Sequence, residues 1–368
     1  MTRGDGSVPP VQKRLICLCL LVALAAAACG GDELEDPSGK KAAADASPEP
    51  EPSPSPEPRL CPLIGLEAGA EIDIKRPAHA VKIDNHPRAR PQAGMPLADV
   101  VYEELVEGGL TRFLVVFHCE NSARLGPIRS ARLVDPDLLV LYSPVLFGYS
   151  GAAPQVLSKV RSTGGVINLE HGANGPAYQR VGGRPAPHNL YTSSDALLSL
   201  PASQGVQGPP KTGYTFDESL LAGPPPPAPA ASVDPAAPPP PPPLGSGVDL
   251  SYSPGSSVSY TYDAASKKYL RSQGGGPHND ESGARLGGTN ILVFKVAVQI
   301  VGGSAHIGVT GEGEATVLRG GQAVQGKWRR PSLGDQFTLV DASGQPISLA
   351  PGNIWINLVP SDRAVTVK

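Results

Sequence analysis

Polar and charged side chains that could bind or transform a ligand gather in short segments between residues 84 and 192. The first segment is a loop that holds carboxylate, amide, imidazole and guanidinium groups, and the later ones add arginines, a serine and a second histidine. The candidate ligand-binding residues are Asp84, Asn85, His86, Arg88, Arg90, Glu103, Glu107, Arg112, Arg129, Ser130, Arg132, His188 and Asn189. The planar guanidinium of arginine suits carboxylate and phosphate groups. The pattern therefore predicts a site for an anionic ligand.

The same residues could also supply acid–base chemistry. Asp84, His86 or Glu107 would act as general acid or base, and the arginines would stabilise an anion formed in the reaction. A purely structural interpretation is also open, because an Asp-Asn-His-Pro run can cap and turn a loop. No complete catalytic motif is present, so the catalytic residues stay unknown and the question of enzymatic activity stays open.

The spacing of the remaining candidate groups disfavours other kinds of site. The histidines lack a short paired spacing such as H-x₃-H, so we expect no metal and no cofactor; they are His86, His118, His171 and His188. Ser150 stands in GYSGA, which is not the G-x-S-x-G pattern of a serine hydrolase. Trp328 and Trp355 could stack on sugars, but two tryptophans in a β domain are more typical of a core.

Hydrophobic periodicity predicts the elements that position these residues. A strand is expected at 79–83, just before the polar loop, and a buried strand at 113–118. Apolar residues between them recur at spacings of 3, 4 and 5, which predicts an amphipathic helix over 97–106 that ends before Gly108 and Gly109. A further strand at 144–149 and a short helix at 154–161 follow. This order predicts an α/β N-terminal domain with a mixed sheet.

The C-terminal third has a different rhythm. Short β-prone runs, such as 258–263, 291–298 and 336–340, alternate with turn residues. This pattern predicts a smaller, mostly antiparallel β domain.

Two low-complexity segments divide the chain. Residues 29–60 are rich in Pro, Glu, Ser and Ala and are expected to be a disordered linker. Residues 223–247 contain runs of four and six prolines and are interpreted as a Pro-rich spacer. Docking of a partner that reads polyproline is the alternative. The two domains are then expected at 61–222 and 248–368.

The N-terminus carries the pattern of an exported lipoprotein. Lys13 and Arg14 precede a 14-residue apolar run at 15–28, which is too short to span a membrane and predicts a signal peptide over 1–28. The run ends in AAACGG, which resembles a bacterial lipobox and makes Cys29 the predicted lipid attachment site, with palmitate among the acyl chains. An ordinary secretory signal with a chance cysteine is the alternative. We expect a lipid-anchored protein on the extracytoplasmic face of the cell membrane.

Charge and cysteine content agree with export. The chain has a net charge of −3, and since 1–29 carries +2 and 30–60 carries −5, the remainder is neutral. A neutral folded part gives no electrostatic argument for nucleic-acid binding. Beyond Cys29 only Cys61 and Cys119 remain, and two thiols in an oxidising compartment predict a disulfide, with two buried free thiols as the alternative.

Several motifs together resemble a known family. RPAHAVKIDNHPRARPQAG, ADVVYEELVEGGLTRFLVVFH, GPIRSAR and APHNLYT, followed by YDAASKKYLR, GPHNDESGARL, GKWRRPS and PGNIWINLVP, resemble the YerB-like bacterial lipoproteins, a family of unknown function. The likeness covers about 61–221 and 250–368. It implies an exported, lipid-anchored, two-domain protein and no established activity.

Three functions remain open from the sequence. The first is binding of an anionic cell-wall glycan or peptide in a cleft of the N-terminal domain that is lined by Arg, His and Asp. The second is a hydrolase or lyase that acts on cell-wall polymers. The third is a non-catalytic scaffold that recruits other envelope proteins, with the Pro-rich insert as a docking segment.

Overall fold

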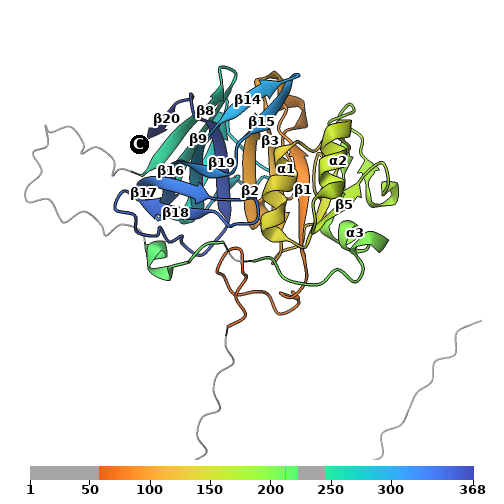
Figure 1. Cartoon of the computed structure of the whole chain (residues 1–368), viewed down its shortest axis with the longest axis horizontal. Helices are drawn as coiled ribbons and strands as arrows, with labels where there is room; N and C mark the ends of the chain where they lie inside the picture. Colours follow the sequence, from red (N-terminus) through yellow and green to blue (C-terminus); the bar gives the residue numbers. More distant parts are fainter. Residues whose placement is uncertain (1–57, 212, 223–244) are drawn as a thin grey trace, which may run out of the picture. The chain divides into compact units, whose positions relative to one another are not determined.

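The computed structural model describes residues 58–211, 213–222 and 245–368 (Figure 1). The predicted signal peptide, Cys29, and most of the linker and of the Pro-rich insert lie outside the described residues. Within the described part of the chain, no helix is long and apolar enough to cross a membrane.

A ten-stranded mixed sheet is the main element of the described residues. It contains strands from both predicted domains, side by side. In spatial order the strands are β18 (Thr338–Asp341), β17 (Gln322–Arg330), β16 (Gly311–Arg319), β13 (Asn290–Val296), β19 (Ile354–Pro360), β2 (Val100–Leu105), β3 (Thr111–Phe117), β1 (Ala78–Asp84), β4 (Val145–Tyr149) and β5 (Val166–Glu170).

The direction of the strands places several carboxyl ends together. β1, β4 and β5 are parallel neighbours, and β13, β19 and β2 are parallel neighbours. β3 is antiparallel to both β1 and β2, so these two groups run the same way. The carboxyl ends of β1, β2, β4 and β5 therefore meet at one end of the sheet, together with the amino end of β3.

A second sheet packs on one face of the first. It comprises β11 (Gly276–Pro277), β10 (Lys268–Gln273), β9 (Ser256–Asp263), β8 (Gly247–Ser253) and β20 (Val365–Val367), and β12 (Gly287–Gly288) also pairs with β10. Tyr252 and Tyr260 of this sheet share a core with Phe113 and Trp355 of the large sheet. Two hairpins complete the strands: β6 (Gln179–Arg180) with β7 (Leu190–Tyr191), and β14 (Val298–Val301) with β15 (Ser304–Ile307).

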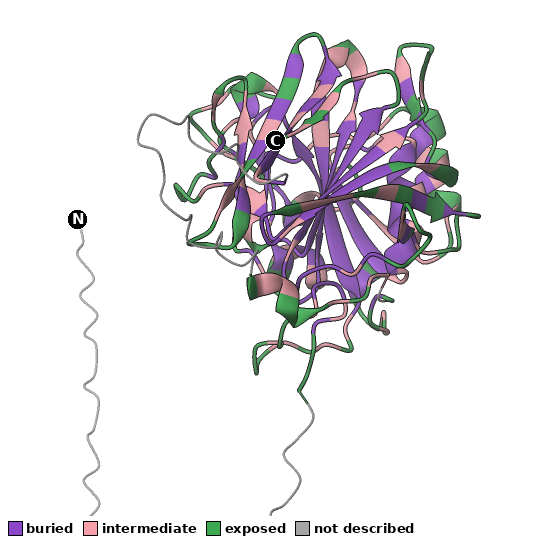
Figure 2. Cartoon of the chain, turned by 90° about the vertical axis from the view of Figure 1, so that its left-hand side faces the viewer, coloured by how far each residue is buried: buried purple, intermediate pink, exposed green. Residues whose placement is uncertain are grey.

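Helices are few and short among the described residues. α1 (Val134–Leu139) and α2 (Pro154–Ser162) lie against the face of the large sheet that the second sheet does not cover (Figure 1). Leu138 and Val160 of these helices belong to the hydrophobic core on that face. α3 (Ser194–Leu198) packs on the same face as the second sheet. Figure 2 shows the strands of the large sheet as largely buried. The 3₁₀ turns are Pro87–Ala89, Met95–Leu97, Glu107–Gly109, Val140–Tyr142, Gly175–Ala177, Pro201–Ser203 and Glu218–Ala222.

Most predicted elements are present. β1, β3, β4 and α2 confirm the elements expected at 79–83, 113–118, 144–149 and 154–161, and the mixed sheet is confirmed. The C-terminal strands are mostly antiparallel, with the parallel pairing of β13 and β19 as an exception. Because helices are so few, the description α/β fits only loosely.

The helix expected over 97–106 is wrong, because Val100–Leu105 is strand β2. β2 is buried on both faces: Val100 and Tyr102 enter one core, and Val101 enters the other. A strand buried on both sides loses the strict alternation of apolar and polar residues. The pair of Gly108 and Gly109 does mark a stop, since both have positive φ in the turn before β3.

Candidate functional site

The candidate site lies at the end of the large sheet where the carboxyl ends of β1, β2 and β4 meet. Asp84 is the last residue of β1 and is paired in register with Arg112, at the amino end of β3. The segment 126–132 crosses this end, held by the Arg129 N–H to Lys82 O bond of 2.8 Å and the Ser150 N–H to Arg129 O bond of 3.0 Å. Ligands of open α/β sheets commonly bind outside the carboxyl ends of the strands.

Asp84 is the centre of the site and is 3% exposed. Its Oδ2 lies 2.8 Å from His188 Nδ1 and 3.1 Å from Arg129 Nε, and its Oδ1 accepts the backbone N–H of His86 at 3.0 Å. Burial alone would raise the pKa of Asp84. The hydrogen bonds from His86 and His188 and the charges of Arg129 and Arg112 outweigh it and hold that pKa below its ordinary value.

The two histidines of the site are stacked. The rings of His86 and His188 have centroids 4.6 Å apart and planes at 19°. Partial burial and the charge of His188 lower the pKa of His86. The contact with Asp84 occupies Nδ1 of His188, which is 7% exposed.

Two further arginines converge on the carbonyl oxygen of Ser130. Arg112 Nη1 donates to it at 3.0 Å and Arg132 Nη1 at 3.2 Å. Arg132 is also paired with Glu107 through Nη2, and through Nε at 2.9 Å. Burial and the neighbouring Arg132 lower the pKa of Arg112 to about 10, as expected where cations crowd.

Hydroxyl groups complete the surface of this cluster. Ser130 Oγ lies 3.5 Å from Ser150 Oγ, which follows β4. The structure thus brings together eight of the candidate residues predicted from the sequence: Asp84, His86, Glu107, Arg112, Arg129, Ser130, Arg132 and His188. We call these eight residues the sheet-end cluster.

Other predicted site residues lie elsewhere. The side chain of Arg88 is exposed, and Asn189 bonds to Arg180 Nη1 at 2.9 Å and to Val181 O at 3.1 Å. Asn85 is fully buried within the loop, and its Oδ1 accepts a hydrogen bond from Nε of the partly buried Arg90 at 3.0 Å.

Glu103 belongs to a buried network that links the two predicted domains. Its carboxylate oxygens accept from Arg271 Nη2 at 2.7 and 2.8 Å, and neither side chain is exposed. Arg271 Nη1 donates to His278 Nδ1, and His278 Nε2 lies 2.8 Å from Gln92 Oε1. This arrangement requires a neutral His278 with its proton on Nε2. Burial and the charge of Arg271 lower its pKa to about 2.

A second buried network lies on the opposite face of the sheet. Lys82 Nζ lies 2.5 Å from Glu104 Oε1 and 2.7 Å from Asp135 Oδ1, and all three side chains are fully buried. Burial and the nearby Asp135 raise the pKa of Glu104. Asp135 Oδ2 also accepts the backbone N–H of Arg132 at 2.6 Å, so this network positions the sheet-end cluster.

The sequence analysis did not single out Lys82, Asp135, Arg271 or His278. Lys82 stands between Val81 and Ile83 in a fully buried strand, and an ionisable residue in that position signals a buried partner. Asp135 and the 271–278 pair carried no comparable signal, since they are far from their partners in sequence.

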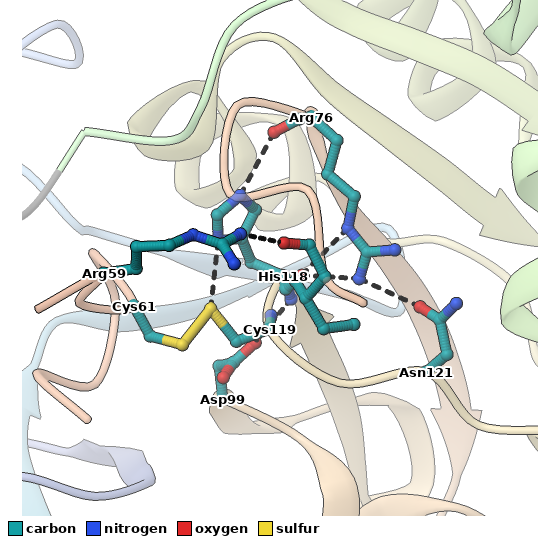
Figure 3. Close-up of a disulfide and its surroundings, with 8 residues drawn as sticks. Arg59, Cys61, Arg76, Asp99, His118, Cys119 and Asn121 are labelled. Atoms are coloured by element: carbon teal, nitrogen blue, oxygen red, sulfur yellow. Dashed lines mark hydrogen bonds between the residues drawn. A yellow bond between two sulfur atoms is a disulfide. The ribbon is translucent and has the colours of Figure 1, made fainter. Parts of the chain in front are cut away.

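Cys61 and Cys119 form a disulfide in the structure, with Cα atoms 6.0 Å apart (Figure 3). Asp99 Oδ2 accepts the backbone N–H groups of His118 and, at 3.1 Å, Cys119. Arg76 Nε donates to His118 O at 3.0 Å. The bridge fixes the start of the described chain to the end of β3.

No group of three or more His, Cys, Asp or Glu side chains suited to a metal ion occurs among the described residues. His118 is fully buried, and burial lowers its pKa to about 4. Trp328 and Trp355 are 2% and 1% exposed, so both lie in the core.

Comparison of the sequence with protein families and with known proteins identifies its family and a relative. Residues 63–207 match the "Protein of unknown function (DUF3048) N-terminal domain", and residues 248–356 match the corresponding C-terminal domain. The chain belongs to the DUF3048 family. A curated relative from Bacillus subtilis (strain 168), "Putative lipoprotein YerB", is 28% identical over 314 residues, which cover 83% of this chain and 88% of the relative.

The fold of this DUF3048 chain is similar to a solved structure. The crystal structure of YerB protein from Bacillus subtilis matches with a TM-score of 0.68 and 24% identity, covering 83% of this chain and 99% of that one. The resemblance to YerB-like proteins found in the sequence motifs is thereby confirmed.

Proposed function

We propose that this protein is a lipoprotein of the cell envelope whose sheet-end cluster binds an anionic group of a cell-wall glycan or peptide. Cys29 would carry the lipid and hold the protein on the extracytoplasmic face of the membrane. The name of the Bacillus subtilis relative supports the lipoprotein part of the proposal. A carboxylate or phosphate is the expected ligand group.

One observation carries the binding proposal: the cluster holds three guanidinium groups against two carboxylates. Arg129 is paired with Asp84 and Arg132 with Glu107, whereas Arg112 makes its hydrogen bond to a carbonyl oxygen. Arg129 is 23% exposed and Arg132 is 15% exposed, so ligand oxygens can reach both. An incoming anion would balance the excess positive charge and gain charge-assisted hydrogen bonds.

The test is co-sedimentation of the full-length chain, purified in detergent, with cell-wall material that carries its anionic polymers. We expect an Arg129→Ala, Arg132→Ala double variant to bind at least about tenfold more weakly, equivalent to about 1.4 kcal/mol. Arg363→Ala is the matched control, because it removes a partly exposed arginine whose ion pair in the described part of the chain is with its neighbour Asp362. Equal retention of the double variant, with an unchanged melting temperature, would exclude the cluster as the binding site.

A hydrolase or lyase acting on cell-wall polymers is the second candidate, and the Asp84–His188 pair favours it. A carboxylate at Nδ1 fixes the tautomer of a histidine that exchanges a proton through Nε2. We expect release of wall fragments by the full-length chain, reduced at least about a hundredfold in His188→Gln. The absence of products from wild-type protein on the same wall material that it binds would leave binding as the function.

A further inference from the structure

β20 is an open edge of the second sheet. It lies at one end of the strand order β11-β10-β9-β8-β20, and β8 is the strand that pairs with it among the described residues. Such an edge presents unpaired backbone N–H and C=O groups to any extended chain that approaches it.

The register shows which groups those are. Lys368 N–H donates to Gly247 O at 2.9 Å, and Ser251 N–H donates to Ala364 O at 3.2 Å. In an antiparallel pair the hydrogen-bonded residues alternate, so Ala364, Thr366 and Lys368 face β8. The N–H and C=O groups of Val365 and Val367 therefore point away from β8, toward the open edge.

In the described part of the chain, the edge strand β18 of the large sheet is covered, unlike β20. β18 ends the ten-stranded order, but the chain folds back over it: Asp341 N–H donates to Gln345 O and Ile347 N–H donates to Leu339 O, both at 2.9 Å. This fold-back occupies the outer side of β18. β20 has no comparable cover among the described residues.

A cavity of about 830 Å³ borders the open edge of β20. Val365 is the lining residue that comes from the second sheet, and the rest of the wall is the large sheet and its 341–344 turn. Thr316, Gln325 and Lys327 present polar side chains along this wall. The volume is within the range of about 300–1,000 Å³ that is usual for ligand pockets.

We propose that this groove is a docking site for an extended polypeptide segment, which adds to β20 as a further strand. The partner's backbone would pair with Val365 and Val367, and its alternate side chains would enter the cavity. Recognition by strand addition has two requirements. Main-chain hydrogen bonds at an open edge give affinity, and pockets for alternate side chains give specificity. The lining carries both signs of charge, including Lys327 and Glu314, which favours polar side chains in the partner.

Hydrogen exchange on the full-length chain tests the geometry and the binding together. The probe is an end-capped octapeptide of alternating Thr and Val with one Lys and one Glu. In the free protein the amides of Val365 and Val367 should exchange faster than that of Thr366. Saturating probe should slow both at least tenfold, and a probe with Pro in place of alternate Val residues should not.

Two proline variants test the role of the outward N–H groups of β20. Val365→Pro and Val367→Pro each remove an outward N–H without removing a bond to β8, so each should weaken binding of the probe at least tenfold. Thr366→Val is the matched control and should bind like the wild type. Unchanged binding in either proline variant that keeps the wild-type melting temperature would overturn the proposal. So would a failure of the wild type to protect Val365 and Val367 at millimolar probe.

Discussion

The interior of this protein keeps a histidine neutral by giving each of its nitrogens a fixed partner. His278 accepts from Arg271 and donates to Gln92, and it is 4% exposed. Protonation would place a second cation against Arg271 and remove the acceptor at Nδ1. The pKa of about 2 in the folded protein is far below the unfolded value near 6.5.

This depressed pKa predicts a loss of stability on acidification. The unfolded chain binds a proton at His278 below about pH 6.5 and the folded chain does not, so the stabilisation is present above that pH and falls as the pH drops. We expect up to about 1.4 kcal/mol of lost unfolding free energy per pH unit from this residue between pH 6 and 4. Urea unfolding of wild type and His278→Gln at these pH values checks it, and equal pH slopes would contradict it.

At the residue scale, the sequence predicted the chemical groups of the site better than it predicted where each residue lies in the fold. The loop 84–92 and the GPIRSAR segment do supply Asp84, His86, Arg129 and Arg132 to one cluster, because the loop starts at the carboxyl end of β1 and GPIRSAR is hydrogen-bonded to that same end through Arg129 N–H and Lys82 O. Glu103 and Asn85 are also among the predicted site residues, but the structure buries both side chains fully. Glu103 is paired with Arg271, which is 168 residues away along the chain, and a single sequence does not reveal such a pairing.

At the scale of elements, strand β2 is held by charges on both of its faces. Glu103 meets Arg271 on one side and Glu104 meets Lys82 on the other. The apolar residues around these two glutamates recur at spacings of 3, 4 and 5, which is why the periodicity predicted a helix. The burial of both depends on basic partners from β10 and β1, which local sequence patterns do not report.

Removing one partner of the Glu103–Arg271 pair should strongly destabilise the fold. We expect Arg271→Met to cost about 3–5 kcal/mol in unfolding free energy, since it leaves Glu103 as an uncompensated buried charge. Arg329→Met is the control: its ion pair with Glu312 is half exposed to solvent and should contribute little to stability. Denaturant unfolding measures both. A similar small cost for the two variants would mean that the buried pair is not needed for stability.

At the scale of the whole molecule, the two family segments share one sheet. β19 of the C-terminal segment lies between β13 and β2, and β2 belongs to the N-terminal segment. The sequence predicted a segment with a mixed sheet followed by a mostly antiparallel β segment. It did not predict that the two share a sheet, because the pairing of Val100 with Ile354, 254 residues apart, leaves no local pattern.

We expect the N-terminal segment to fold poorly alone. A fragment of residues 58–222 would expose the edge of β2 that β19 covers and would leave Glu103 buried without Arg271. Its thermal unfolding, followed by near-ultraviolet circular dichroism, should lack a cooperative transition that the full-length chain shows. A sharp transition in the isolated fragment would contradict the shared-sheet dependence.

The disulfide between Cys61 and Cys119 has a mechanical consequence. A pull transmitted along the chain from its N-terminal side would reach Cys61 first and pass through the covalent bridge to Cys119, directly after β3. β3 is an interior strand of the ten-stranded sheet, paired on both sides. The load would then shear a paired strand lengthwise instead of peeling residues 62–118 away one contact at a time. A protein tethered at that end would gain resistance to being drawn out by its own anchor.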